Sequence, residues 1–311
     1  MWVDELINNP NPSSFYKNMG MTVPTFMKLK DLLEGHGVLC DLKYVMSTEK
    51  LATLLYMPLT GLSNQKLQQR FQRSASTISI IINQLINDIS TNRSLMSKYI
   101  KLPAQGSETP EEIKNNPKFL PYFDDCIGAV DGSHIPVYVE DQTQYINCKG
   151  YPSQNILAVC NFNMEFTFVM PGWEGSAHDG RLWDAAQVKS LQIPEGKWLL
   201  GNAGFPLSNS CLIPYQATKY HLKDWDVELF NLRHSSARNV IEQIFGVIKN
   251  NCLNMDGLDG SNSLDNQQPE TLDYGFLHNS GITQAESSQA SIKRDKIAMN
   301  MWTNYQKLLR H

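Results

Sequence analysis

The sequence DDCIGAVDGSHIPV at residues 124–137 decides how the rest of the chain is interpreted. Its apolar run at residues 126–130 predicts a short buried strand that ends at Asp131-Gly132. Asp131 then has two interpretations of equal weight. It is either a carboxylate at a strand end that binds a metal ion, or half of an Asp-Gly turn, which commonly terminates strands.

The residues that follow predict an α/β domain. Short apolar runs at residues 156–162, 166–170 and 198–200 are typical of buried strands. Helices are expected at about residues 175–188 and 235–249. Three strands, a helix, a strand and a helix in this order indicate a mixed sheet of four or five strands flanked by helices.

Before this domain, the apolar side chains of residues 15–100 recur every three or four residues, which predicts helices. One helix ends near Phe71 and the next covers residues 75–89, so the pair is a helix-turn-helix candidate. A plain helical bundle fits this spacing equally well, and the second helix carries no basic residue. The candidate DNA contacts near the turn are Lys66, Arg70 and Arg73.

Composition divides the chain into five parts. A helical, helix-turn-helix-like domain is expected at residues 1–100, followed by a linker at 101–118 with three prolines, a Gly-Ser pair and adjacent glutamates. The α/β domain is expected at 119–250. Residues 251–290, rich in Asn, Ser, Asp, Gly and Gln, are expected to be irregular, and residues 291–311 to form a C-terminal helix.

Composition and charge exclude several classes of protein. Hydrophobic residues make up 41% and aromatic residues 10%, which is typical of a globular protein. No apolar run reaches the roughly 18 residues that span a bilayer, and the first residues lack a signal-peptide core. We therefore expect a soluble, intracellular protein with no membrane partner.

The net charge of −4 is unevenly distributed. Residues 1–108 contain 11 Lys and Arg against 8 Asp and Glu, a balance of +3. The rest of the chain contains 16 against 23, a balance of −7. Because nucleic-acid binders usually have a clearer basic surface, the charge favours DNA binding only mildly.

Six scattered cysteines form no C-x-x-C pair. In a chain of this size, that pattern argues against both a disulfide framework and a structural zinc site. We expect reduced thiols, most of them buried.

Two more acidic residues are candidates for metal-dependent chemistry. Phosphodiester cleavage with two Mg²⁺ or Mn²⁺ ions requires carboxylates that converge from distant parts of the chain. Asp179 lies where a helix is expected to begin, and the spacing Ser176-x-x-Asp179 favours a capping box. Glu242 lies one helical turn after Arg238, and a surface ion pair between the two is its simplest interpretation.

Four segments, in order, resemble those of the Harbinger (P instability factor) transposases, and together the matches cover about residues 15–250. They are GLSNQKLQQRFQRSASTIS (61–79), DDCIGAVDGSHIPV (124–137), GYPSQNILAVCNFNMEFTFVMPGWEGSAHDGRLW (150–183) and LFNLRHSSARNVIEQIFGVIK (229–249). The resemblance implies an RNase H-like domain, a divalent metal ion (Mg²⁺ or Mn²⁺), cleavage and strand transfer of DNA, and a nuclear location. It also implies a Myb-like partner protein that helps to bind DNA, and homo-oligomerisation is left open.

Residue by residue, the resemblance assigns metal ligation and catalysis to Asp131, Asp179 and Glu242. For Asp179 this replaces the capping-box interpretation as the favoured one. Arg181 and Arg238, which lie in the matching segments, are further candidates for DNA contact.

The sequence departs from the family pattern in ways that affect activity. The fourth strand of the family ends in a metal-binding aspartate, whereas here it ends in Asn202, which is neutral and offers one carbonyl oxygen. We therefore predict a severe loss of cleavage. The helix that follows the glutamate helix in the family is missing or scrambled in residues 251–279, and Ile80 stands where many relatives carry a basic residue.

Three hypotheses remain open. The chain is an active or formerly active transposase nuclease, a domesticated non-catalytic protein that binds DNA or chromatin partners, or a relic of a mobile element. Asn202 argues against full activity, whereas the intact Asp131, Asp179 and Glu242 argue against long unconstrained decay.

Overall fold

The structure is a computed structural model that describes all residues except 1, 138, 140–142, 217–224, 253–281 and 310–311. The chain forms two compact units, which are described separately. The helical unit contains Met1–Tyr99 and the helical residues 246–252, and the sheet unit contains Ile100–Phe245 together with the C-terminal helix. No helix in the described part of the chain combines the length and the apolar character needed to cross a membrane.

The helical unit confirms the helices expected from apolar spacing. Their ends carry capping residues: Asn11 and Thr22 accept hydrogen bonds from amides of the first turn, and Gly20 and Gly61 end helices in the left-handed conformation. The helices are α1 (Trp2–Ile7), α2 (Pro12–Met19), α3 (Val23–Gly35), α4 (Ser47–Thr60), α5 (Asn64–Phe71), α6 (Ala75–Thr91) and α7 (Arg93–Tyr99).

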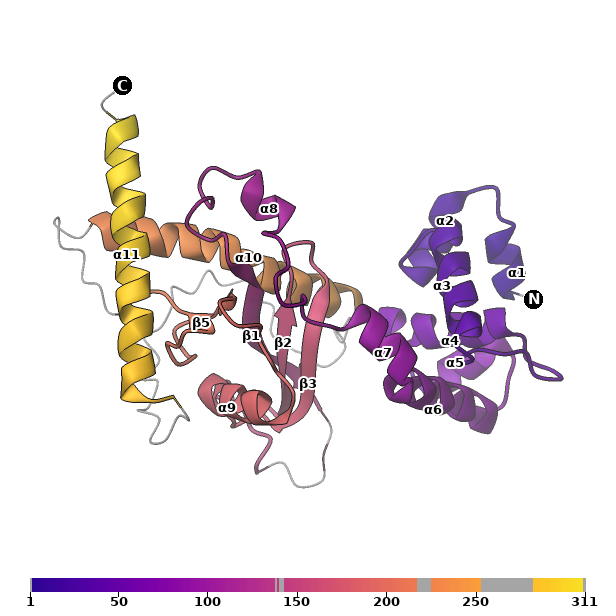
Figure 1. The fold of residues 1–311 in the computed structure, drawn as a ribbon. Coiled ribbons are helices and arrows are strands. Elements are labelled where there is room, and N and C mark those ends of the chain that lie inside the picture. Colours follow the sequence, from indigo (N-terminus) through magenta and orange to yellow (C-terminus); the bar gives the residue numbers. More distant parts are fainter. Residues whose placement is uncertain (1, 138, 140–142, 217–224, 253–281, 310–311) are drawn as a thin grey trace. The chain divides into compact units, whose positions relative to one another are not determined.

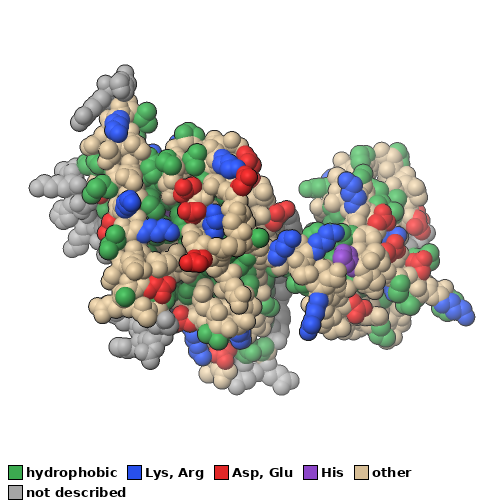
Figure 2. All heavy atoms as spheres, viewed as in Figure 1, with side chains coloured by type: hydrophobic (Ala, Val, Ile, Leu, Met, Phe, Trp, Pro, Cys, Tyr) green, Lys and Arg blue, Asp and Glu red, His purple; other side chains and the backbone are tan. Residues whose placement is uncertain are grey.

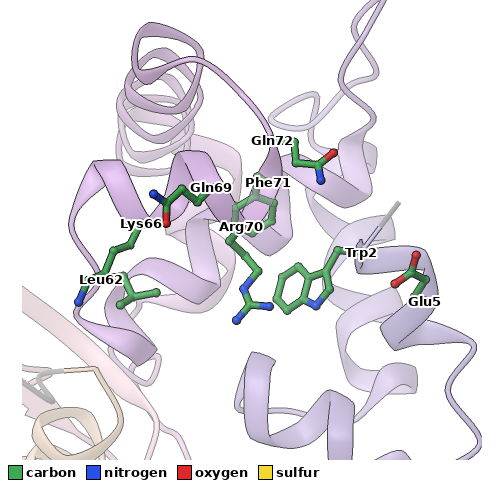
Figure 3. A pocket seen from close by; sticks show the side chains of 8 residues that line it. All are labelled: Trp2, Glu5, Leu62, Lys66, Gln69, Arg70, Phe71 and Gln72. Carbon is green, nitrogen blue, oxygen red and sulfur yellow. The ribbon is translucent and has the colours of Figure 1, made fainter.

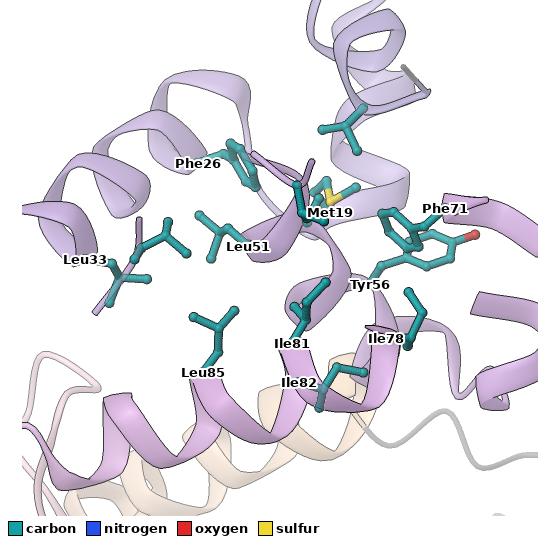
Figure 4. Packing of buried hydrophobic residues seen from close by; sticks show 14 of the residues in the cluster. Met19, Phe26, Leu33, Leu51, Tyr56, Phe71, Ile78, Ile81, Ile82 and Leu85 are labelled. Atoms are coloured by element: carbon teal, nitrogen blue, oxygen red, sulfur yellow. The ribbon is translucent and has the colours of Figure 1, made fainter. Parts of the chain in front are cut away.

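One apolar cluster holds the helical unit together (Figure 4). Phe15 and Phe26 contact edge to face at 5.3 Å between ring centroids. Helix α6 contributes a stripe of buried side chains because its apolar residues recur at three- and four-residue spacing. Each such side chain contributes about 1.5–3 kcal/mol when it is fully buried. The stripe consists of Ile78, Ile81, Ile82 and Leu85.

The break between α5 and α6 lies where the sequence predicts it. Gln72 ends α5 in the left-handed conformation, with φ of 51°. Ser74 begins α6, and its hydroxyl accepts a hydrogen bond from the Thr77 amide at 3.2 Å. The two helices and their turn are thus confirmed, whereas DNA binding by them stays a prediction.

The sheet unit contains five strands in the order β3-β2-β1-β4-β5. Strand β1 pairs antiparallel with β2 and parallel with β4, so the sheet is mixed, as expected for an RNase H-like domain. The β2–β3 pair is antiparallel and the β4–β5 pair is parallel. The strands are β1 (Cys126–Pro136), β2 (Ser153–Cys160), β3 (Phe166–Glu174), β4 (Trp198–Leu200) and β5 (Cys211–Leu212).

Helices cover both faces of this sheet (Figure 1). Successive strand residues point to opposite faces, so β1 contributes Ala129 to one core and Val130 to the other. The first core joins the sheet to α10 (Trp225–Cys252) and α11 (Gln284–Leu308). The second joins it to α9 (Asp179–Lys189), whose Trp183 is fully buried.

Strand β1 is longer than the apolar run predicts, and this corrects the turn interpretation of Asp131. Asp131 pairs with Ala158 and Gly132 with Leu157, so β1 continues through both residues to Pro136. The hydrogen bonds to β2 keep the backbone extended where Asp-Gly alone suggests a turn. Asp131 therefore lies inside a strand.

Other boundaries also differ from expectation. The expected linker contains a short helix, α8 (Glu111–Lys114), which buries Ile113. Helix α10 begins at Trp225, well before residue 235. Helix α11 begins at Gln284, because Thr283 accepts a hydrogen bond from the Glu286 amide, so the end of the expected irregular segment is helical. Residues 253–281 of that segment lie outside the described residues.

Candidate active site

Three of the predicted site residues meet at one edge of the sheet. Strands β1 and β4 are parallel neighbours in which Ala129 is opposite Leu200. Asp131 and Asn202 each lie two residues beyond this pair, so they reach the same edge. The Asn202 Nδ2 donates hydrogen bonds to Asp131 Oδ1 at 2.9 Å and to Asp179 Oδ2 at 3.1 Å.

Asp179 comes from the start of α9, but not in the way that the capping box predicts. The N-cap of α9 is His178, and Asp179 is the first helical residue. The Ser176 hydroxyl instead donates to the Gln144 carbonyl at 3.1 Å. Because the helix begins about four residues later than expected, the Asp179 carboxylate hydrogen-bonds to Asn202 rather than capping its own helix.

Glu242 is connected to this group through Arg238. The Arg238 Nη1 lies 3.4 Å from Asp131 Oδ2, and its Nη2 donates to Glu242 Oε1. The ion pair expected from the spacing on α10 is therefore confirmed, and Arg238 extends it to the buried carboxylate. The side chain of Glu242 is 51% exposed, whereas that of Asp131 is 16% exposed.

Burial dominates the electrostatics of the two inner carboxyls. It raises the pKa of Asp131 to about 6, and the nearby Arg238 offsets only part of this effect. Burial also raises the pKa of Asp179, against the hydrogen bond from Asn202. The site thus holds two carboxylates close together with less positive charge than they need.

The pKa of Asp131 predicts how the stability of the metal-free protein depends on pH. A folded-state pKa near 6, above the ordinary 3.8, means that the folded carboxyl holds its proton between about pH 4 and 6, where the unfolded one releases it. The folded state therefore loses stability as the pH rises through this window. Asp131→Asn removes this ionisable carboxyl. The change that it causes in the free energy of unfolding should therefore be about 1–2 kcal/mol more favourable to the folded state at pH 7 than at pH 4.5.

Urea unfolding in EDTA at the two pH values measures this difference. His234, whose pKa burial lowers to about 4, acts in the opposite direction but is present in both proteins and cancels. An Asp131→Asn effect that is equal at pH 4.5 and 7 contradicts the prediction.

The oxygen atoms at this edge fit a divalent cation. Among the described residues, no three His, Cys, Asp or Glu side chains are arranged to hold a metal ion. Two carboxylates nevertheless lie together here, and Asn155 Oδ1 beside them is buried without a hydrogen-bond partner. Oxygen ligands of this kind suit Mg²⁺ or Mn²⁺. Asn155 is not among the site residues predicted from the sequence, although its position directly before the apolar run at residues 156–162 could have indicated it.

Gly132 makes the close approach of these groups feasible. A Cβ atom at this position would lie 2.4 Å from Asp179 Oδ1 and 3.3 Å from Asn155 Oδ1. Any side chain here would therefore displace Asp179 from Asn202 and Asp131. Glycine is required for the space that it leaves, since its backbone is that of an ordinary strand.

Gly132→Ala is expected to disable the site while the fold persists. The added methyl group turns the Asp179 side chain away, which should lower Mn²⁺ affinity by about 10- to 100-fold. Since a terminal oxygen can rotate aside, the free energy of unfolding should fall by only about 1 kcal/mol. Calorimetric Mn²⁺ titration and urea unfolding measure the two effects. Unchanged Mn²⁺ affinity, or loss of the fold, contradicts this expectation.

The predicted DNA contacts of the helical unit have different surroundings. Lys66 and Arg70 line a pocket of about 740 Å³, where the Arg70 guanidinium lies 4.7 Å from the centre of the Trp2 ring (Figure 3). Arg73 instead forms an ion pair with buried Glu49. A contact of Lys66, Arg70 or Arg73 with DNA stays a prediction.

In the sheet unit, Arg181 is exposed and lies 5.7 Å from the centre of the Trp173 ring, whereas Arg238 is held by Asp131 and Glu242. The face in Figure 2 shows Lys and Arg side chains interspersed with Asp and Glu on each unit, without one continuous basic patch. This agrees with the mild charge asymmetry of the sequence.

The five described cysteines are unpaired. Three of them are buried in the sheet unit, which confirms the expectation of mostly buried thiols: Cys126, Cys160 and Cys211. Cys40 and Cys148 are exposed.

Comparison with known proteins places the site in a family context. Residues 130–273 match the DDE superfamily endonuclease model, and residues 1–91 match a domain of unknown function. The rat protein HARBI1, which its name classes as a nuclease, is 28% identical over 187 residues, or 58% of this chain and 51% of the relative. Human HARBI1 gives the same values. An ALP1-like protein of Arabidopsis thaliana is 26% identical over 160 residues, or 45% of this chain and 38% of the relative.

The chain thus spans about half the length of the HARBI1 relatives that it matches. No solved structure gives a significant match. The endonuclease match covers all four positions of the site: Asp131, Asp179, Asn202 and Glu242. Residues 130–273 of this chain thus match a DDE superfamily endonuclease domain, and the chain is homologous to the HARBI1 proteins and to ALP1-like proteins.

Proposed function

We propose that this chain is a DDE-type nuclease of the Harbinger kind that binds DNA and a divalent cation, and that Asn202 strongly weakens its strand cleavage. The observation that carries the proposal is the meeting of Asp131, Asp179 and Asn202 at the edge between β1 and β4. Endonucleases of this superfamily generally use divalent metals and act on DNA.

Each residue has a distinct role in this proposal. Asp131 and Asp179 hold the cation, Mg²⁺ or Mn²⁺, through their carboxylates. A bound divalent cation neutralises charge on the scissile phosphate and activates the attacking water. Glu242 is the third acidic residue, and Arg238 keeps it near Asp131 in the absence of DNA. When the phosphate backbone approaches, Arg238 can exchange a carboxylate for a phosphate oxygen, which it recognises equally well.

Asn202 explains why cleavage should be weak rather than normal. Its amide gives two hydrogen bonds to the carboxylates but no negative charge to a cation. Phosphoryl transfer depends mainly on charge neutralisation at positioned cations, so a missing carboxylate acts directly on the rate.

A cleavage assay tests the proposal. The full chain is incubated with Mn²⁺ and DNA that carries the terminal inverted repeats of its own element, with and without a Myb-like partner protein. We expect slow nicking that Asp131→Ala abolishes. If neither the native chain nor Asn202→Asp nicks DNA under any of these conditions, the nuclease proposal is wrong.

A second function is favoured by the same amide. Because the Asn202 Nδ2 donates a hydrogen bond to each carboxylate and so holds the two together without a cation, the fold can persist as a non-catalytic, domesticated DNA- or chromatin-binding protein. DNA binding that survives Asp131→Ala, without nicking by any variant, supports this alternative. Under either function we propose action in the nucleus, with a Myb-like protein and further copies of the chain as candidate partners.

A further inference from the structure

Asn155 of β2 lies beside the inner carboxylates, and one end of its side chain has no partner. The residue is 1% exposed, and its Oδ1 makes no hydrogen bond. A buried polar group without a partner costs about 1–3 kcal/mol, so it is rarely retained unless a ligand, ion or water molecule satisfies it.

The orientation of this amide is fixed by its other end. The Nδ2 of Asn155 donates to the Ala177 carbonyl at 3.1 Å. Rotating the amide by half a turn would bring its oxygen against that carbonyl, so the arrangement with Nδ2 toward Ala177 is the one that hydrogen bonding allows. The oxygen of Asn155 is therefore directed away from Ala177.

The Asn155 oxygen lies next to Gly132, where the absence of a Cβ atom lets the Asp179 carboxylate approach. The point where a Cβ of Gly132 would lie is 3.3 Å from Asn155 Oδ1 and 2.4 Å from Asp179 Oδ1. The two oxygens thus border the same small volume, next to the carboxylate that Asn202 joins to Asp131. Two acceptors that border one volume are satisfied when a cation or a hydrogen-bond donor lies between them.

We propose that Asn155 belongs to the cation site, and that its Oδ1 contacts the divalent cation held by Asp131 and Asp179 or a water molecule bound to it. This inference rests on the proposed metal-dependent function and adds a positioning residue to it. An amide oxygen here provides an additional neutral ligand where Asn202 has removed a charged one. Asn155 also holds Ala177, two residues before Asp179, so it fixes the approach of that carboxylate.

Two substitutions of similar size separate these roles. Asn155→Asp and Asn155→Leu both remove the donor to Ala177, but only the aspartate retains an oxygen that faces the site. If Asn155 contacts the cation shell, Asn155→Leu should weaken Mn²⁺ binding by about tenfold or more. Asn155→Asp, which adds a negative charge, should bind Mn²⁺ at least as tightly as the native chain.

Titration with Mn²⁺ alone, followed by electron paramagnetic resonance of the free ion, measures these affinities without relying on activity. Asn147→Leu is the matched control, because Asn147 is also buried and both ends of its amide are hydrogen-bonded within the chain. It should lower stability and leave Mn²⁺ affinity unchanged. The titrations are performed in the native chain and in the Asn202→Asp background.

The outcomes distinguish this inference from the proposed function. If Mn²⁺ binds and both Asn155 variants change its affinity equally, or not at all, the role of Asn155 is only structural and the inference is overturned. If Mn²⁺ binds neither to the native chain nor to Asn202→Asp, the metal-dependent function itself fails, and the inference fails with it. If Asn155→Leu weakens Mn²⁺ binding and Asn155→Asp does not, the result supports both the role of Asn155 and the metal-dependent function.

Discussion

Asn202→Asp is expected to increase Mn²⁺-dependent DNA cleavage by about a hundredfold or more, which corresponds to at least ~3 kcal/mol of transition-state stabilisation. The variant supplies a third carboxylate at the end of β4, within hydrogen-bonding distance of Asp131 and Asp179. It also keeps the local backbone, because the Asn202 Oδ1 that accepts from the Gly204 amide at 2.7 Å has an equivalent in aspartate. The change therefore acts mainly through charge.

The same substitution should destabilise the protein when no cation is present. It replaces two hydrogen bonds from Nδ2 with repulsion between a new carboxylate and the two that burial already penalises. We expect a lower melting temperature in EDTA and a larger stabilisation by Mn²⁺ than in the native chain, since binding to the folded state alone raises stability. The opposite signs in EDTA and Mn²⁺ distinguish a gained cation ligand from a general change in packing.

Nicking of terminal-repeat DNA, together with thermal unfolding in EDTA and Mn²⁺, provides the measurements. Asn209→Asp serves as the control. Asn209 also follows β4, but it is exposed and its side chain hydrogen-bonds to Gln289 rather than to the carboxylates. It should change neither nicking nor the Mn²⁺ effect. Cleavage by Asn202→Asp that stays at the native level, despite tighter Mn²⁺ binding, would mean that charge at this position does not limit the reaction.

The sequence predicts the elements of this site better than their contacts. Two apolar runs of strand character predict that Asp131 and Asn202 each follow a strand core, whereas the parallel pairing of β1 and β4 that brings the two residues together is known only from the structure. The length of β1 does not follow from the sequence, because its continuation past Asp131 depends on hydrogen bonds with β2, far away in the sequence. Propensity at Asp-Gly favours a turn, and tertiary pairing overrides it.

The roles of the individual side chains are still harder to predict. The Arg238–Glu242 pair depends on helical spacing alone and is predicted correctly, whereas the reach of Arg238 to Asp131 depends on how α10 packs on the sheet. The capping box at Ser176 fails because Ser176 finds the Gln144 carbonyl, a contact between distant segments. Spacing in the sequence predicts contacts between residues that are close in the chain, whereas most contacts of this site join residues that are far apart in the chain.

The second large effect concerns Arg73, and we expect Arg73→Leu to lower the free energy of unfolding of the helical unit by about 3–5 kcal/mol. Arg73 lies in the turn between α5 and α6, and its Nε and Nη2 donate to the two carboxylate oxygens of Glu49 at 2.7 and 2.8 Å. The side chain of Glu49 is 1% exposed. Removing the guanidinium leaves this charge buried without its ion-pair partner, and also removes a hydrogen bond to the Tyr44 carbonyl.

Urea unfolding of the full chain measures this loss, and two other variants identify its cause. The double variant Arg73→Leu with Glu49→Leu removes both charges and should recover most of the stability, because an apolar pair can replace a buried ion pair. Arg70→Leu, at an arginine that contacts Trp2 at the pocket, should lower stability by only about 1 kcal/mol.

DNA affinity then separates the two arginines. If Arg70 contacts phosphate, Arg70→Leu should weaken DNA binding to a similar extent for all DNA sequences. It should also lower the slope of log affinity against log salt concentration by about 1. The double variant at Arg73 and Glu49 should retain native DNA affinity, since the guanidinium is engaged with Glu49 and Tyr44. A double variant that is stable yet loses DNA binding and salt dependence would instead make Arg73 a phosphate contact. The Arg73–Glu49 ion pair would then exist only in the free protein, and Arg73 would leave Glu49 to bind a phosphate group when DNA binds.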